Sequence, residues 1–285
     1  MRPSFQRLAP ACVAACVAAF PGIARADLSL TAAPAPDSQP WRAPAKIAAT
    51  HADGQPTTYA VQAAVNYTTP AWSWGENSVW QGAFSPFVSR NTALSKKQDN
   101  QGLAANLFGA MGDLTEQTFG LLAQAGVAAR RDRVKDDTAY TLTADLSPVS
   151  VKYRLGGSGR PAGSGYFFLP TVGIYSDTIA RIDGDVGKGT VQGVRAQLEA
   201  LWYPAKSILT RASVQLQHDT SASGDRIKEN RKLYTVGVSY LFYDELTAKT
   251  GTWRPSIALE RVYGADLLQG LEKQGVTQLT FKLAY

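Results

Sequence analysis

The sequence predicts an all-β protein, an antiparallel transmembrane β-barrel of 12 strands, from three observations. Segments of the chain alternate apolar and polar side chains, which indicates strands with one apolar face and one polar face. The segments have the roughly nine to eleven residues that a tilted strand needs to cross a bilayer, about twice the ordinary strand length. Charged residues make up only 18% of the chain, below the roughly 25% of globular domains. We therefore expect the outer face of the barrel wall to contact lipid and the inner face to enclose a polar interior.

The N-terminus has the pattern of an export signal over residues 1–26. Arg2 and Arg7 precede an apolar stretch, and the small residues at 24–26 form a cleavage pattern. A short buried helix and a lipoprotein processing site at Cys16 are the alternatives. Cleavage after residue 26 would remove both cysteines, so we expect no thiol or disulfide chemistry in the exported protein.

Two further regions follow the signal. Residues 27–43 are rich in proline and alanine, and we expect them to form a disordered or loosely attached arm on the periplasmic side. Residues 44–285 form the barrel. The whole chain has a formal net charge of +6. Residues 1–26 contain three arginines and no acidic residue, so the mature chain left after cleavage carries +3. Such a mild balance gives no reason to expect a nucleic-acid partner.

The alternating segments place the strands in order along residues 44–285. Counted back from the C-terminus, we expect them near 276–285, 252–263, 232–243, 208–217, 191–203, 165–175, 138–153, 118–129, 101–111, 79–90, 58–67 and 45–51. The segment at 45–51 has the weakest pattern, and it is included because bacterial barrels have an even number of strands. In the strand at 138–153 the apolar positions change parity at Pro148, which predicts a β-bulge there.

The chain ends on an amphipathic segment, TQLTFKLAY (residues 277–285), whose last residue is aromatic. Together with the signal ending at Ala26 and the alternating strands, this ending resembles the outer-membrane β-barrel proteins of Gram-negative bacteria. The resemblance implies a location in the outer membrane, among its lipids and lipopolysaccharide. It also implies that the barrel assembly machinery recognises the last strand. The residues given this targeting role are Leu279, Phe281, Leu283 and Tyr285.

An even strand number places both termini at one end of the barrel, which we expect to be the periplasmic end. All six tryptophans and five tyrosines then fall at strand ends on that side. Aromatic side chains with a polar edge favour the headgroup boundary of a membrane, so we expect an aromatic girdle there. These residues are Trp41, Trp72, Trp74, Trp80, Trp202, Trp253, Tyr153, Tyr166, Tyr203, Tyr243 and Tyr285.

Charged and amide side chains occupy the polar parity of the last strands and are candidates to line the lumen. Such side chains can form a constriction that selects solutes, or they can pair into a network that fills a narrow barrel. We favour the packed or partly packed network. The candidates are Arg195, Glu199, Arg211, Gln215, Arg254, Glu260 and Lys282.

The segment QLQHDTSASGDRIKENRKLYT (residues 215–235) resembles the active hairpin of outer-membrane phospholipase A, another 12-stranded barrel. The resemblance implies that His218 is a general base, Thr220 a nucleophile and Asn230 the residue that orients the imidazole. Threonine replaces the serine of that family, the spacing to Asn230 differs, and only three predicted strands follow the hairpin. We therefore favour an ordinary exposed loop with turn-forming residues.

The expected function is a narrow passive channel for small hydrophilic solutes. A structural or assembly-partner barrel with a closed lumen and a lipid-acting hydrolase at residues 215–235 are the alternatives. We expect no enzyme, cofactor or metal centre. The only histidine besides His218 is His51, and the sequence contains no phosphate-binding loop, zinc motif or nucleophile elbow.

Overall fold

The computed structural model describes residues 27–31, 45–52, 58–75, 77–92, 98–112, 119–134, 136–150, 152–156, 165–181, 187–243, 253–266 and 271–284. The predictions for residues 1–26, for Trp41 and for Tyr285 lie outside these ranges. All regular structure within them is β-strand. A search of the same ranges finds no helix long and apolar enough to cross a membrane.

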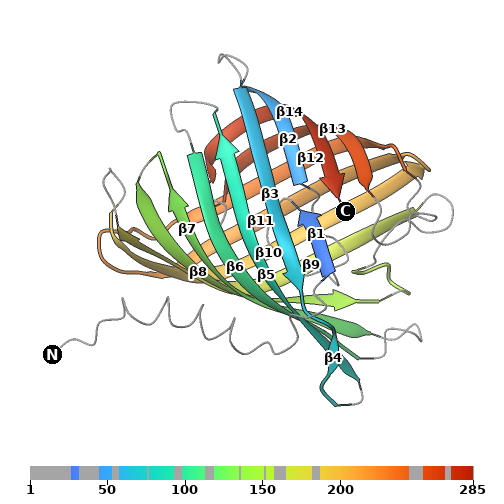
Figure 1. Ribbon diagram of the computed structural model, residues 1–285, viewed down its shortest axis with the longest axis horizontal. Helices are drawn as coiled ribbons and strands as arrows, with labels where there is room; N and C mark the ends of the chain where they lie inside the picture. Colours follow the sequence, from blue (N-terminus) through green and yellow to red (C-terminus); the bar gives the residue numbers. More distant parts are fainter. Residues whose placement is uncertain are drawn as a thin grey trace.

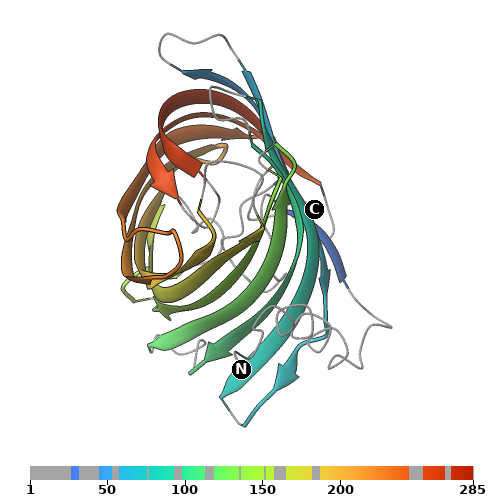
Figure 2. The same ribbon diagram turned by 90° about the vertical axis from the view of Figure 1, so that its left-hand side faces the viewer.

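Twelve of the 14 strands that the structure describes form a closed antiparallel barrel (Figures 1 and 2). Each strand pairs with the next along the chain, and β14 pairs back to β2 to close the wall. The predicted fold class and the number of 12 barrel strands are confirmed, and the weakest predicted strand, at 45–51, is among them. The barrel strands are β2 (Ala45–Ala52), β3 (Thr58–Thr68), β5 (Ser78–Asn91), β6 (Gln98–Met111), β7 (Gly120–Asp132), β8 (Asp137–Val149), β9 (Gly165–Arg181), β10 (Gly189–Ala205), β11 (Ile208–Ala222), β12 (Asn230–Leu241), β13 (Arg254–Asp266) and β14 (Leu271–Ala284).

The first and last barrel strands begin and end at the same end of the barrel, where Ala45 of β2 pairs with Leu283 of β14. We call this the terminal end and the opposite one the distal end. The turn between β7 and β8 and the loop between β11 and β12 lie at the distal end. That the terminal end faces the periplasm stays a prediction.

The two faces of the wall differ in polarity, in the reverse sense to a water-soluble protein. On β10, Val194 and Leu198 are both 45% exposed on the outer face, whereas Glu199 on the inner face is only 5% exposed. Exposed aliphatic side chains also mark the outer face of β9, at Val172 and Ile174, and of β12, at Val236 and Val238, whereas Asp177 of β9 and Ser239 of β12 are buried on the inner face. An apolar exterior over a polar interior is the pattern of a barrel surrounded by hydrocarbon.

The strand expected over residues 138–153 is shorter than predicted, and no bulge occurs at Pro148. Strand β8 ends at Val149, and the chain then turns so that Ser150 bridges to Leu155. Proline has no N–H to donate to a ladder, so it suits the last positions of a strand. The change of parity at Pro148 therefore marks a strand end followed by a turn.

The first residues of the expected arm are part of the sheet. Asp27–Thr31 form β1, which pairs with β3 and places Thr31 opposite Ala64. Strand β2 pairs with the same edge of β3 further along, where Lys46 lies opposite Gln62. The expectation of a loose arm is thus wrong for β1, whose backbone bonds to β3. Residues 32–44 lie outside the described residues.

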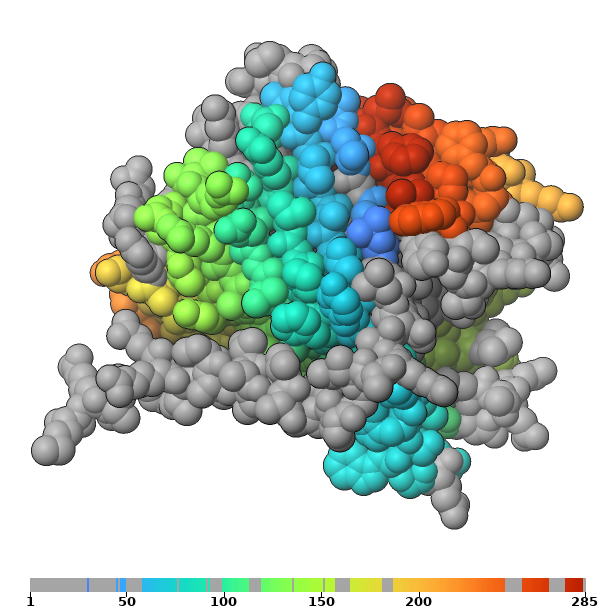
Figure 3. All heavy atoms as spheres, in the orientation of Figure 1, coloured from blue at the N-terminus to red at the C-terminus, as the bar shows by residue number. Residues whose placement is uncertain are grey.

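A short hairpin extends beyond β3 and β5 at the terminal end (Figures 1 and 3). Its outer strand is β4 (Trp72–Ser73), which pairs with Trp80 and Val79 of β5. The rings of Trp74 and Trp80 lie 6.3 Å apart, and Trp74 is exposed.

All five described tryptophans lie near the terminal end, and Trp202 and Trp253 are exposed there. Tyr166 is exposed as well, but Tyr203 faces inward and is only 3% exposed. Tyr203 follows the outward-facing Trp202 directly, so its side chain must point to the other face of the strand. The interpretation of these aromatic residues as a membrane girdle stays a prediction.

Candidate functional site in the lumen

The inner wall carries an ion pair that bridges over one strand. Arg195 of β10 donates from Nε to Asp145 Oδ1 of β8 at 2.6 Å, and its Nη2 bonds the other carboxylate oxygen. Two parallel bonds of this kind fix the guanidinium plane and are stronger than bonds between neutral groups. The arginine side chain is partly exposed to the interior, whereas the aspartate side chain is buried.

A glycine makes this bridge possible. Gly173 of β9 lies between the two partners, opposite Arg195 on one side and opposite Asp145 on the other. A Cβ at Gly173 would clash with the Asp145 carboxylate and with the Ala144 carbonyl oxygen. The missing side chain therefore lets the ion pair lie flat against the wall.

Two further ion pairs join neighbouring strands nearer the terminal end. Arg211 of β11 donates to Glu199 of β10 at 2.7 Å, and Lys282 of β14 donates to Glu260 of β13 at 2.5 Å. The second oxygen of Glu260 also accepts from the Gln278 amide at 3.2 Å. Buried charges need such partners because desolvation of an unpaired ion costs several kcal/mol.

Towards the distal end, Asp177 of β9 is fully buried and is shared between two arginines. Arg130 of β7 lies 3.2 Å from it, and Arg226 of the loop between β11 and β12 lies 3.7 Å from it. The Thr141 hydroxyl donates to the same carboxylate at 2.8 Å. Asp177 thus connects three parts of the distal rim.

Asp219 of β11 holds a second distal cluster. Its carboxylate accepts from Arg231 at 2.8 Å, from the backbone N–H of Glu229 at 2.9 Å and from the Tyr175 hydroxyl. The tyrosine crosses β10 at Gly193, where a Cβ would clash with its ring. Arg231, which is nearly buried, also pairs with Glu229 at 2.9 Å.

The ion pairs between wall strands share one geometry. Each pair named above joins strands that are neighbours or next but one around the barrel. The named pairs therefore run along the wall between nearby strands. Paired charges of this kind keep the inner wall polar.

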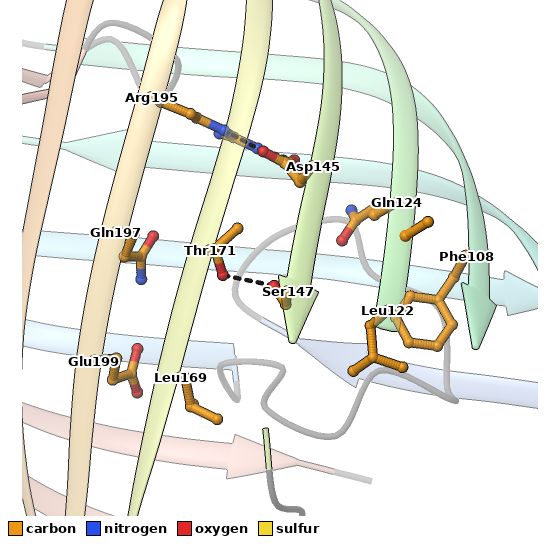
Figure 4. Close-up of a pocket in the computed structure, with 11 residues that line it drawn as sticks. Phe108, Leu122, Gln124, Asp145, Ser147, Leu169, Thr171, Arg195, Gln197 and Glu199 are labelled. Carbon is orange, nitrogen blue, oxygen red and sulfur yellow. Dashed lines mark hydrogen bonds and ion pairs between the residues drawn. The ribbon is translucent and has the colours of Figure 1, made fainter. Parts of the chain in front are cut away.

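Between β6 and β10 the inner wall encloses a cavity of about 110 Å³ (Figure 4). The Arg195–Asp145 pair lies along one edge of it, and Ser147 and Thr171 share a hydrogen bond of 2.8 Å in its wall. Apolar side chains and three further polar ones complete the lining. The lining residues are Phe108, Leu122, Ala123, Gln124, Asp145, Ser147, Leu169, Thr171, Arg195, Gln197 and Glu199.

Most of the lumen candidates identified from the sequence take part in these contacts. Five of them form the ion pairs of the middle and terminal parts of the wall: Arg195, Glu199, Arg211, Glu260 and Lys282. Gln215 is half-buried and pairs in register with Gln197. Arg254 is half-buried where β13 begins, away from the cavity.

Sequence reasoning missed the acidic partners Asp145, Asp177 and Asp219. Asp145 lies on the polar parity of β8, between the outward-facing Ala144 and Leu146. The alternation that revealed Arg195 could therefore have revealed Asp145 too. The pairing between them could not be read from alternation, because their strands are not adjacent.

The hairpin of residues 215–235 places its candidate residues on the outer face, at the distal end. His218 Nδ1 and Asn230 Oδ1 lie 2.5 Å apart, and both side chains are exposed. Thr220 is also exposed, and its hydroxyl donates to the Gln192 carbonyl at 3.1 Å. The register between β10 and β11 shifts beside Gln192, so Thr220 has no residue directly opposite it on β10.

The terminal strand presents its apolar side chains outward. Leu279 and Phe281 are exposed on the outer face of β14, and Leu283 is half-buried. Phe281 lies opposite Ile47 of β2, so these residues also form the seam that closes the barrel. Among the described residues, no group of three or more His, Cys, Asp or Glu side chains is placed to hold a metal ion.

Comparisons with known proteins show only distant similarity. No family model matches the sequence, and no curated protein matches it either. Among solved structures, the chain is similar to the NanC porin, with 12% identity, 84% of this chain and 97% of that chain covered, and a TM-score of 0.42.

Two autotransporter structures are similar at the same level. The transport unit of AIDA-I from Escherichia coli has 12% identity and a TM-score of 0.43, with 100% of this chain and 98% of that chain covered. The translocator domain of NalP from Neisseria meningitidis has 9% identity and a TM-score of 0.42, with 99% of each chain covered. Similarities this distant assign no activity, so the function has to be argued from the chain's own residues.

Proposed function

We propose that this barrel is a narrow passive channel for small hydrophilic solutes in the outer membrane of a Gram-negative bacterium. The observation that carries the proposal is the course of the inner-wall ion pairs. They lie along the wall, over Gly173 in the case of Arg195 and Asp145, and so leave polar surface facing the axis. Pairs that linked opposite walls would instead bridge the lumen, and the wall-strand ion pairs described above do not take that course.

The outer face supports the proposed location and orientation. Exposed tryptophans gather at the terminal end, which suits a headgroup boundary. Exposed cations lie on the outer face towards the distal end, where they could bind the phosphates of lipopolysaccharide by charge-assisted hydrogen bonds. These cations are Arg90, Arg131, Lys232 and Arg261, of which Arg131 also pairs with Asp136. The terminal end would then face the periplasm.

The same proposal assigns the last strand to assembly. Leu279 and Phe281 present an exposed apolar row on β14, which suits recognition of the strand before the barrel closes. The barrel assembly machinery would bind this row, and β2 would then pair with the strand. Lipids of the outer membrane would cover the row in the assembled protein.

A tryptophan introduced on the inner wall tests the channel. Gln197→Trp adds a bulky ring at the cavity, and we expect it to lower the unit conductance on the order of two-fold, since lining bulk sets the pore radius. The measurement is single-channel current in planar bilayers. Leu198→Trp adds the same ring to the outer face of the same strand and should leave the current unchanged.

Two results would contradict the channel. Wild-type protein that inserts into bilayers and carries no current above background would show a closed lumen, and a structural or assembly role would replace the proposal. Equal conductance for wild type and both tryptophan variants would show that ions pass by a route other than the cavity wall.

A lipid-acting hydrolase is the second candidate, favoured by the contact between His218 and Asn230 on the outer face. In this reaction the Thr220 hydroxyl attacks a lipid ester, and His218 takes the hydroxyl proton and passes it to the leaving alcohol. Water then hydrolyses the acyl-threonine and releases a fatty acid. Asn230 would hold the imidazole in the required tautomer.

Release of fatty acid from micellar phospholipid with divalent ions tests this second candidate. We expect His218→Ala and Thr220→Ala to lose the activity, by a factor on the order of a thousand or more as for other nucleophile–base pairs. Ser221→Ala removes the neighbouring exposed hydroxyl and should keep the activity. Activity that persists in His218→Ala would remove the assigned base and with it this candidate.

A further inference from the structure

We propose that the cavity on the inner wall is a binding subsite for an uncharged, polyhydroxylated ring, such as that of a neutral sugar, on its way through the channel. The inference rests on the proposed channel function and adds the class of solute. Its basis is the combination of apolar and polar side chains around one cavity of about 110 Å³.

The cavity is amphipathic. Phe108 of β6 and Leu122 of β7 lie close together in one part of its lining, and Leu169 of β9 adds a third apolar side chain (Figure 4). The Arg195–Asp145 pair lies along another part. A sugar ring has an apolar C–H face and a rim of hydroxyl groups. Such a ring can place its face on the apolar side chains and its hydroxyls on the polar ones.

The charges of the cavity select against ions. Asp145 is bound to Arg195, and Glu199 is bound to Arg211 on the next strand. An anionic solute would have to displace a carboxylate from its arginine, and a cationic solute would have to displace an arginine. Either exchange leaves a desolvated charge without its partner. The free energy lost in this way is larger than the free energy gained from the new contact with the solute. A neutral solute can bond to the outer edges of both pairs and leave them intact.

The side-chain amide of Gln197 is placed to form hydrogen bonds with the hydroxyl groups of the solute. Gln197 lies between Arg195 and Glu199 on the inner face of β10 and lines the cavity. Gln215 lies directly opposite it on β11, and both side chains are half-buried. Neither takes part in the side-chain hydrogen bonds described above. An amide offers both donors and an acceptor, which matches the dual character of a hydroxyl.

Solute block of the channel current tests the subsite with D-glucose as the probe, and glucuronate and protonated glucosamine as charged comparisons. We expect glucose to interrupt the current of the wild-type channel more strongly than either charged sugar. Gln197→Ala should weaken the interruption about five-fold, the loss of one neutral hydrogen bond. Gln192→Ala removes the same amide from the outer face of β10 and should match the wild type.

The failure of the subsite and the failure of the channel give different results. A conducting channel that glucose does not interrupt, or in which Gln197→Ala behaves as wild type, overturns the subsite and leaves the channel standing. Protein that carries no current overturns the channel. In that case calorimetric titration of the detergent-solubilised protein with glucose tests whether the subsite exists. Absence of glucose binding, or binding by Gln197→Ala as strong as that by the wild type, overturns the subsite.

Discussion

Asp177→Asn is expected to lower the free energy of unfolding by about 3–5 kcal/mol, the cost of removing one partner from a buried ion pair. Asp177 is fully buried and faces both Arg130 and Arg226, whose side chains are 11% and 8% exposed. Asparagine keeps the shape of the side chain but removes its charge. Two nearly buried guanidinium groups then lose the charge of this carboxylate. The measurement is a urea titration of the barrel in lipid bilayers.

Asp136→Asn is the matched control for this prediction. It makes the same substitution in the ion pair between Asp136 and Arg131. The side chain of Arg131 is 55% exposed and that of Asp136 is 34% exposed. An exposed pair contributes only about 0–1 kcal/mol, and asparagine tolerates the positive φ of 48° at this position. If the two substitutions lowered the free energy of unfolding equally, the burial of Asp177 would not explain how much its ion pairs stabilise the barrel.

Val172→Arg is expected to lower the free energy of unfolding in a bilayer by about 2–4 kcal/mol, the cost of a cation on the lipid face near the midplane of a membrane barrel. Val172 lies midway along β9, is exposed on the outer face, and is paired with Leu146 and Ala196 on the strands beside it. An arginine there cannot reach water without crossing this apolar surface. The same titration in bilayers measures the effect.

Gln192→Arg provides the comparison for the lipid face. Gln192 is exposed on the outer face of β10, close to the distal end, where an added cation costs about 0–1 kcal/mol. If Val172→Arg were as mild as Gln192→Arg, the middle of the outer wall would not contact hydrocarbon.

The strands of the barrel could be predicted from the sequence because their environment imposes a period of two. Hydrocarbon on one side and a polar interior on the other act on every residue in turn, so the pattern is local. Even the short β2 was predicted in this way. The end of β8 could not be, because Pro148 is compatible both with a bulge and with the last positions of a strand.

The pairing of the inner-wall charges could be predicted only in part. The inward direction of Arg195 follows from alternation, but its partner Asp145 is two strands away and depends on Gly173 between them. No pattern in the sequence around a glycine shows that a side chain from a neighbouring strand lies over it. The strand β1 was missed for a related reason, since five residues are too few for alternation to stand out.

The measurement that tests the account most directly is a scan of single nitroxide labels along residues 194–202 of β10. The chain's only cysteines lie within residues 1–26, so a cysteine introduced into the protein without that segment gives one site at a time. The account predicts that collisions with oxygen, which dissolves in lipid, peak at the even positions. Collisions with a water-soluble nickel complex should peak at the odd ones. Loss of this alternation, or its reversal, would contradict a barrel with lipid outside and a polar lumen inside.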